Sequence, residues 1–197
     1  MRNSITGVFP TPIFESTDPD FECKQDLIDW IYKYKETAQS VVLSNRGGWQ
    51  SDDMFYKTDR SFRPFIDYIS NRINAMIQDS MDKPLTLNNL WVNVNPPGAY
   101  NIMHRHCGCQ YSGVLWVRCP EKSGNFAIIN PNEYQEYDVL DVLTPEVKMP
   151  LNMGLSWEYA PEDGNIILFA AHLPHLVETN HSEEDRISIA FNFFTPR

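Results

Sequence analysis

The stretch that decides the fold is "RISIAFNFF", residues 186–194, near the end of a chain of 197 residues. Its side chains alternate between two kinds, which is typical of a strand with two different faces. One face is apolar and contains Ile187, Ile189, Phe191 and Phe193, and the other contains Arg186, Ser188, Ala190 and Asn192. If the apolar face packs on helices, the polar face looks into a barrel large enough to hold a ligand. The alternative is a polar face that meets solvent.

Five further segments after Pro84 have the same strand-like texture, and turn residues such as Pro-Pro-Gly and Pro-Glu-Asp-Gly separate them. They are residues 85–95, 110–119, 124–131, 154–160 and 164–171. In the first of them, Asn93 and Asn95 alternate with Val92 and Val94, so this strand too has a polar face.

Two helical stretches precede the strands, and both are recognised by apolar residues at helical spacing. The first is predicted to begin at Asp18-Pro19 and to end at residues 45–48. The second covers residues 62–77, with Ser61 as a candidate cap and Pro64 tolerated in the first turn. Helices followed by six strands predict a β-sandwich or barrel with the helices packed on one face.

Size and composition predict one domain, because 197 residues with 42% hydrophobic content suffice for one substantial core. The sequence contains no apolar run of about 18 residues and no basic-then-apolar start, so we expect a soluble, cytoplasmic protein. A net charge of −10 argues against nucleic acid as a partner. A small anionic ligand would therefore need a local positive group. The cysteines, Cys23, Cys107, Cys109 and Cys119, form no Cys-x-x-Cys pair and are predicted to be reduced thiols.

The cluster that carries chemistry is "NIMHRHCGCQYSG", residues 101–113. In an extended segment His104 and His106 point to the same side, so both could bind one metal ion. A third ligand is required, and the remaining histidines are His172, His175 and His181. His175 follows an expected strand at a plausible rim position, whereas the other two fit a role outside the ligand set. Cys107 and Cys109 would lie on the opposite side of the backbone from His106.

Taken in order, four segments resemble the family of 2-oxoglutarate- and iron(II)-dependent oxygenases found in bacteria and phages. They are residues 90–117, "SGNFAIINP", "GNIILFAAHLPHLVETN" and "RISIAFNF", and "FPTPIF" and "GGWQS" near the N-terminus extend the resemblance over nearly the whole chain. The family motifs are a Trp-x-Asn strand, a His-x-His followed by Ser-Gly, and a His-x-Val-x-x-Asn leading to Arg-x-Ser-x-x-Phe-Asn.

The resemblance implies a mainly β fold with helices (α+β), a double-stranded β-helix or jelly roll with an N-terminal helical layer. Residues 1–83 would form the helical layer with an N-terminal strand, and residues 84–197 the jelly-roll core of a single domain. It implies Fe(II) bound by the catalytic residues His104, His106 and His175. It also implies that Arg186 and Ser188 bind the far carboxylate of 2-oxoglutarate, with Asn93 and Asn192 as further candidate contacts. The expected reaction is hydroxylation of a C–H bond with O₂, coupled to decarboxylation of 2-oxoglutarate to succinate.

One position departs from the widespread triad of this superfamily, which is His-x-Asp with a distant histidine. His106 stands where the aspartate would be, and because neutral imidazole donates no charge, a three-histidine site leaves Fe(II) more positive. Two other functions therefore stay open. One is a cupin-type metal enzyme that does not use 2-oxoglutarate, and the other is a non-catalytic jelly roll for binding or structure.

The prime substrate could be a protein residue such as proline, a small metabolite or a nucleotide base, and the sequence does not choose among them, although the acidic charge disfavours the last. The surplus of apolar and aromatic residues is compatible with a homodimer. Residues 131–153 interrupt the strand rhythm and are read as a lid or substrate loop, or alternatively as an extra strand or dimer contact. "NRGGWQS", residues 45–51, could reach the barrel mouth or merely turn the chain.

Overall fold

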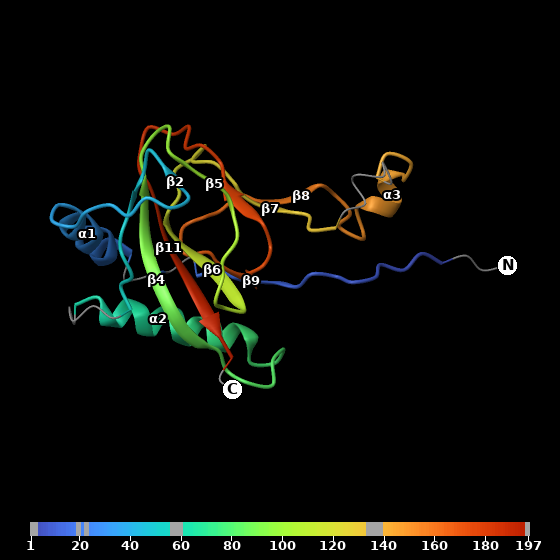
Figure 1. Cartoon of the computed structure of the whole chain (residues 1–197), viewed down its shortest axis with the longest axis horizontal. Coiled ribbons are helices and arrows are strands. Elements are labelled where there is room, and N and C mark those ends of the chain that lie inside the picture. Colours follow the sequence, from blue (N-terminus) through green and yellow to red (C-terminus); the bar gives the residue numbers. More distant parts are fainter. Residues whose placement is uncertain (1–3, 19–20, 22–23, 56–60, 133–139, 196–197) are drawn as a thin grey trace.

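Two antiparallel sheets face each other in the computed structural model, which describes residues 4–18, 21, 24–55, 61–132 and 140–195 (Figure 1). The larger sheet has the order β1 (Ile13–Ser16), β9 (Ile166–Ala170), β6 (Tyr111–Arg118), β11 (Arg186–Phe194), β4 (Thr86–Asn95) and β3 (Trp49–Gln50). The smaller sheet has the order β2 (Asn45–Arg46), β5 (Tyr100–His104), β10 (His175–Val177), β7 (Phe126–Ile129) and β8 (Ser156–Tyr159). This is the predicted jelly roll, and all six predicted strands are present.

Helices α1 (Lys24–Lys35) and α2 (Arg63–Ile77) lie against the outer face of the larger sheet (Figure 1). One hydrophobic cluster joins them to that face, with Ile31 and Ile69 from the helices and Ile187 and Phe191 from β11 all fully buried. Burial of this apolar face on helices turns the other face of β11 inward, as the alternation predicted.

Two helix boundaries differ from the prediction, and the reasons are local. The first helix ends at Lys35, because the amides of Thr37 and Ala38 both bond to the Tyr34 carbonyl and close a turn. The amide of Val41 then pairs with the Gln50 carbonyl, so residues beyond the turn no longer follow the helix. The expected start at Pro19 lies outside the described residues, and so does Cys23.

Ser61 is not the cap of the second helix. The capping position is Phe62, and Ser61 Oγ accepts a hydrogen bond from Trp30 Nε1 at 2.7 Å, which ties the two helices together. Pro64 occupies the first turn, where its missing N–H costs nothing.

The inward face of the larger sheet is built from paired polar positions on β4 and β11. Along the pair of strands, Arg186 lies opposite Asn95 and Ser188 lies opposite Asn93. Further along, Ala190 lies opposite Trp91, and Asn192 opposite Asn89. The central position of β11 between β4 and β6 places this row of side chains in the middle of the space between the sheets.

Besides the helices and an N-terminal strand, β1, which extends the larger sheet, the first 83 residues contain β3 in the larger sheet and β2 in the smaller one. The short strands β2, β3, β5 and β10 were not predicted as strands. β5 and β10 matter most, since they pair with each other and set His104 directly opposite His175. In the part of the chain that the structure describes, no helix is long and apolar enough to cross a membrane.

Gly113 allows β6 to pass close to its neighbours, and we expect its replacement by alanine to destabilise the fold by about 2–4 kcal/mol. A Cβ atom there would overlap the Phe191 ring and the Ile167 carbonyl, and neither can move because both belong to strands that flank β6. Urea unfolding of Gly113→Ala measures the loss. Gly154→Ala is the control, since its Cβ would approach only the Ser156 backbone, at 3.3 Å. Equal stability of the two variants would contradict this account of Gly113.

Candidate active site

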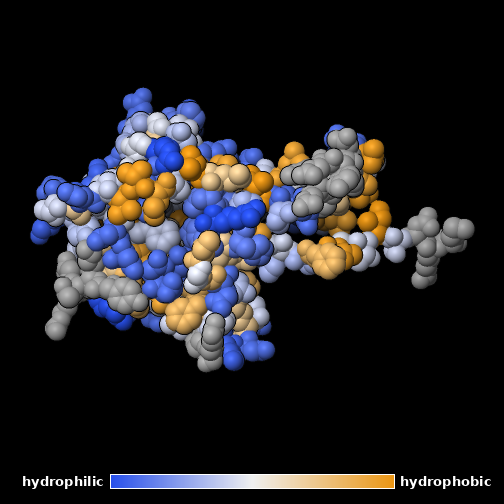
Figure 2. Space-filling model, in the orientation of Figure 1, coloured by the Kyte–Doolittle hydropathy of each residue, from blue (hydrophilic) through white to orange (hydrophobic). Residues whose placement is uncertain are grey.

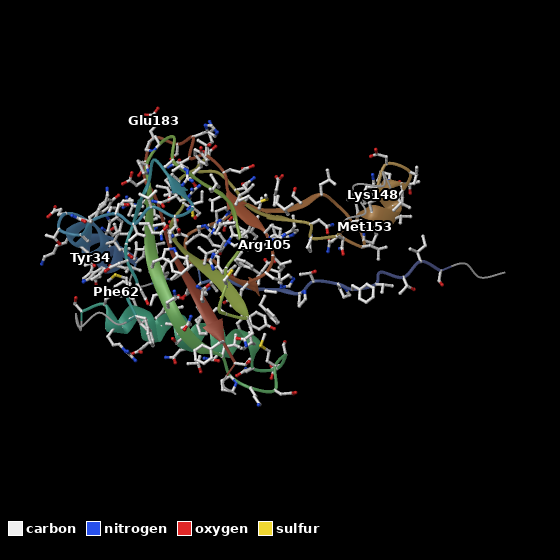
Figure 3. All side chains as sticks on the ribbon, in the orientation of Figure 1. Tyr34, Phe62, Arg105, Lys148, Met153 and Glu183 are labelled. Atoms are coloured by element: carbon white, nitrogen blue, oxygen red, sulfur yellow. The ribbon has the colours of Figure 1, made fainter. Side chains whose placement is uncertain are left out.

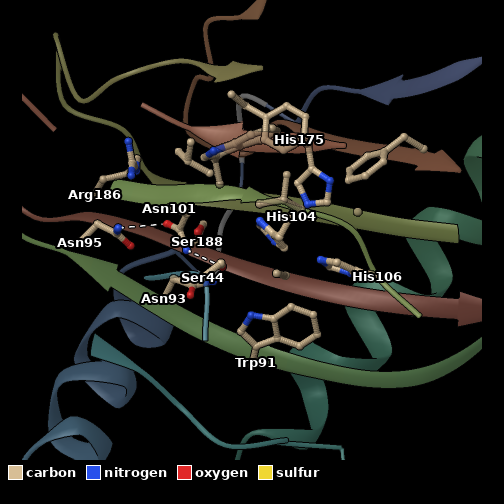
Figure 4. A pocket seen from close by; sticks show the side chains of 17 residues that line it. Ser44, Trp91, Asn93, Asn95, Asn101, His104, His106, His175, Arg186 and Ser188 are labelled. Carbon is tan, nitrogen blue, oxygen red and sulfur yellow. Dashed lines mark hydrogen bonds between the residues drawn. The ribbon is translucent and has the colours of Figure 1, made fainter. Parts of the chain in front are cut away.

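Three histidines converge between the sheets at the join of β5 and β10 (Figure 4). His104 ends β5 and His175 begins β10, and the two are register partners. His106 lies two residues beyond β5, where its amide bonds to the Ala171 carbonyl at 3.0 Å. One potential ligand atom of each histidine lies within 4.8 Å of those of the other two. The exposed residues His172 and His181 do not belong to this group.

On all three rings, hydrogen bonds determine that the proton is on the same nitrogen, Nδ1. His104 Nδ1 lies 2.8 Å from the Ile102 carbonyl, and His175 Nδ1 lies 3.0 Å from the Leu173 carbonyl. His106 Nδ1 lies 2.6 Å from Oδ1 of Asn192. Because a carbonyl oxygen only accepts, each Nδ1 must carry the proton, which leaves each Nε2 with a free lone pair. Such an acceptor on the far nitrogen is what orients metal-binding histidines generally.

The imidazoles are also held neutral. Burial lowers the pKa of His104 and of His106, and burial together with the neighbouring His104 lowers the pKa of His175 to about 3. A neutral ring keeps its lone pair available at physiological pH, as a metal ligand must. In charge, tautomer and spacing, these three residues fit a divalent transition metal ion.

Arg186 lines the same cavity on the side away from His106 (Figure 4). Its side chain is 2% exposed, and Nη1 donates to the carbonyls of Ser123 and Glu178. Among the described residues, Nη2 has no hydrogen-bond partner although it is buried. Burial lowers the pKa of Arg186 to about 10, so the guanidinium still carries its charge at neutral pH.

A buried charge with an unpaired donor is costly unless an anion completes it. Gly124 helps to build this arrangement, because a Cβ there would overlap the carbonyls of Thr179 and Glu178. The glycine lets the loop that carries Ser123 approach Glu178 closely enough for both carbonyls to hold one guanidinium.

Between Arg186 and the histidines, the cavity is lined by Ser188 and Asn93, both predicted from the sequence. Asn93 Oδ1 is buried and, in the described part of the chain, without a hydrogen-bond partner. Asn95 and Asn101 also line the cavity, joined by a hydrogen bond of 3.2 Å, and Asn101 bonds in turn to Ser44. The space between these atoms is about 540 Å³, open mouth included.

Asn192 lies in a different place from the one expected for a co-substrate contact. It is not among the residues that line the cavity, and its side chain bonds to His106 and to Asn89. Cys107 is exposed and Cys109 half-buried, and neither belongs to the histidine group.

Sequence reasoning missed the wall residues Trp91 and Ser44, and also Ser112, which bonds to His106 from behind. Trp91 faces Ala190 across the strands, and its ring lies 5.5 Å from that of His106. The alternation of "LWVNVN" already put Trp91 on the face of Asn93, so this residue could have been found. Ser44 could not, because it reaches the cavity through a pairing of residues 44–46 with β5. "NRGGWQS", residues 45–51, itself forms the edge strands β2 and β3, and its residues are not among those that line the cavity.

The excursion at residues 131–153 contains the short helix α3 (Pro145–Lys148) and projects away from the sheets, where Lys148 and Met153 mark it in Figure 3. Apolar atoms gather over this projection (Figure 2), and Val142 and Met149 are 81% and 75% exposed. Residues 133–139 lie outside the described part. An extra strand was one alternative for this excursion, and its described part contains the helix α3. The expected roles of the excursion as a lid, substrate loop or dimer contact stay predictions.

A model of the protein family described as "Putative 2OG-Fe(II) oxygenase" matches residues 89–192. This range contains the three histidines, Arg186, Ser188 and most of both polar strands, and it exceeds half of the chain. A comparison with curated proteins found no match.

Solved structures similar to this one belong to oxygenases that are distant in sequence. A prolyl-4-hydroxylase of Pseudomonas putida is 13% identical, with a TM-score of 0.63 and 94% of each chain covered. A prolyl hydroxylase of Trichoplax adhaerens, in complex with a hypoxia inducible factor peptide fragment, is 15% identical, with a TM-score of 0.65 over 93% of this chain and 83% of that one. HygX of Streptomyces hygroscopicus, with nickel and 2-oxoglutarate bound, is 13% identical, with a TM-score of 0.61 over 94% and 83%. These similarities establish the shared fold.

Proposed function

Because the chain belongs to the 2OG-Fe(II) oxygenase family, we propose that its inter-sheet cavity is the active site of a hydroxylase, with His104, His106 and His175 as the iron ligands. The protein is a 2-oxoglutarate- and Fe(II)-dependent oxygenase, and the roles of individual residues are inferred from their places in the cavity. When bound, the iron and 2-oxoglutarate together supply the oxidation by O₂ of a C–H bond, with the keto acid decarboxylated to succinate.

The three histidines would hold the ion through Nε2, the nitrogen that their hydrogen bonds leave free. Three neutral ligands on neighbouring backbone segments leave the other coordination positions open to the cavity, as a catalytic metal site requires. A site with an open side can accept a chelating co-substrate, whereas a closed structural site cannot.

Arg186 would bind the far carboxylate of 2-oxoglutarate through Nη2, with Ser188 on the same face of β11 adding a hydrogen bond. Main-chain carbonyls fix Nη1, so the guanidinium is already oriented before the co-substrate enters. Asn93, whose side-chain oxygen is unpaired within the described chain, is a candidate to accept a hydrogen bond from a water or ligand group that lies between Arg186 and the histidines.

The observation that carries this proposal is the unpaired, buried guanidinium in the same cavity as the three-histidine cluster. A molecule with a chelating group at one end and a carboxylate at the other satisfies both ends at once. A cupin-type enzyme without 2-oxoglutarate would have no need of the cation, and a binding module would have no need of three converging lone pairs.

For the prime substrate, we propose a C–H bond presented at the cavity mouth by a protein residue or a small molecule. The similar structures include prolyl hydroxylases, one of them with a bound peptide, and HygX. The walls near the histidines are largely apolar, with Trp91, Phe169 and Val177 among them. Such walls would exclude water from the reaction and accept an apolar part of the substrate.

The proposal is tested by adding Fe(II) and then 2-oxoglutarate to the apo-protein without oxygen. We expect a weak charge-transfer absorption in the visible region, because a keto acid must chelate protein-bound iron to produce it. Zn(II) in place of Fe(II) should give no band, which controls for absorption by the protein. Iron bound at one equivalent per chain with no band on addition of 2-oxoglutarate would contradict the proposed co-substrate.

A further inference from the structure

His106 is oriented differently from the other two histidines. The rings of His104 and His175 donate to main-chain carbonyls, which no substitution can remove. His106 Nδ1 instead lies 2.6 Å from Asn192 Oδ1 and 2.8 Å from Ser112 Oγ. Among the described residues, His106 is the histidine of the cluster whose ring is oriented by side chains.

The two side chains behind His106 are themselves locked in place. Ser112 Oγ donates to Asn192 Oδ1 at 2.7 Å, and Asn192 Nδ2 donates to Asn89 Oδ1 at 2.9 Å. Ser112 is fully buried and Asn192 is 7% exposed. The three residues come from the adjacent strands β6, β11 and β4, where Asn192 is the register partner of both Asn89 and Ser112.

This network decides which atom faces His106. The amide nitrogen of Asn192 donates to Asn89 and its oxygen faces the imidazole, and an oxygen there requires the proton on Nδ1. Nε2 is then free, in a ring whose centroid lies 5.2 and 5.0 Å from those of His104 and His175. The amide is uncharged, so it orients the ring without adding negative charge to the site.

We propose that Asn192 and Ser112 are positioning residues that hold His106 in the form with a proton on Nδ1 and a metal-binding lone pair on Nε2. The inference rests on the proposed function, since it takes the histidine cluster as the metal site. It assigns to Asn192 a role in metal binding in place of the co-substrate contact expected from the sequence.

The test measures metal binding directly, by competition of the apo-protein with a chelator for Co(II) and by the visible absorption of bound Co(II). Asn192→Leu removes the acceptor, and we expect its Co(II) affinity to fall about 10- to 100-fold, with a changed absorption spectrum. Asn192→Asp keeps an acceptor of nearly the same shape. Its affinity should equal or exceed that of the wild type, because a carboxylate makes the ring a stronger donor and Asn89 can turn its amide to face it.

Ser112→Ala leaves the contact between His106 and the Asn192 amide in place. It should lower Co(II) affinity about several-fold, less than Asn192→Leu does. The matched control is Asn74→Leu on α2, which removes side-chain hydrogen bonds to the backbone of Ser70 and Leu85, none of which lines the cavity. Its Co(II) affinity and spectrum should match those of the wild type. If Asn192→Leu does not fold, Asn192→Ala has the same expected result.

A folded Asn192→Leu variant with the affinity and spectrum of the wild type would overturn the inference. Equal losses in Asn192→Leu and Asn192→Asp would also overturn it, because only Asn192→Leu removes the acceptor for His106 Nδ1. A wild-type protein that binds no Co(II) would instead remove the proposed function itself, so the two failures are distinguishable.

Discussion

Arg186→Ala is expected to weaken 2-oxoglutarate binding by roughly 100-fold or more while Fe(II) affinity changes by no more than about threefold. The expected loss corresponds to about two charge-assisted hydrogen bonds made by a buried guanidinium, at roughly 1.5–3 kcal/mol each. Fe(II) affinity should change little, because the hydrogen bonds of Arg186 go to the Ser123 and Glu178 carbonyls and not to the three histidines. The charge-transfer band, titrated with 2-oxoglutarate without oxygen, measures the effect.

A second keto acid turns this comparison into a test of the contact itself. 2-Oxobutyrate has the same chelating end and lacks the far carboxylate, so it should bind the wild type weakly and Arg186→Ala equally weakly. If Arg186→Ala weakens the binding of 2-oxoglutarate but not that of 2-oxobutyrate, the loss of affinity comes from the contact between Arg186 and the far carboxylate and not from general damage to the cavity. Arg186→Lys retains the charge without the planar fork and should lie between wild type and alanine. Unchanged 2-oxoglutarate affinity in Arg186→Ala would favour the cupin-type alternative.

His175→Ala should lower Fe(II) affinity on the order of 100- to 1,000-fold, because it removes one of three protein ligands. His175 is buried, and its ring also packs on Phe126 of the smaller sheet and on Phe169 of the larger one. Metal competition measures the loss. A second measurement is thermal stability. Iron that binds only the folded state raises the melting temperature of the wild type, and it should no longer do so in His175→Ala.

His172→Ala is the matched control, three residues earlier on the same loop and exposed. It should keep wild-type iron affinity and the full thermal shift. Loss of iron in His172→Ala with retention in His175→Ala would show that the ligand set is wrong. The comparison is sharp because the sequence alone left both residues as candidates for the third ligand.

The larger sheet could be predicted well from the sequence because its strands have strong local patterns. In residues 186–194 and 90–95, strict alternation separates a face that packs on helices from a face that lines the cavity, and the structure has both. The three-histidine cluster follows the expectation from His-x-His and the rim position of His175, and its role as iron ligands remains to be measured.

The smaller sheet was harder to predict because its strands are short and depend on partners far away in sequence. β10 has three residues, and its register with β5 is irregular between His175 and Val177, so local alternation gives little signal. Asn192 illustrates a different limit. Alternation correctly placed it inward, but a face does not reveal which neighbour a side chain will bond to, and here the neighbour came from a loop 86 residues away.

The two binding tasks are divided between the two sheets, apart from His106, whose ring is oriented by Asn192 and Ser112 of the larger sheet. His104 and His175 belong to the smaller sheet, while Arg186, Ser188 and Asn93 belong to the larger one. In evolutionary terms, the two tasks can then diverge separately: substitutions at Arg186, Ser188 and Asn93 could retune or discard the co-substrate while the histidines and the Asn192 contact of His106 stay intact. A descendant of this fold could acquire a different organic acid in the same cavity through a few changes on one sheet, with its metal chemistry inherited unchanged.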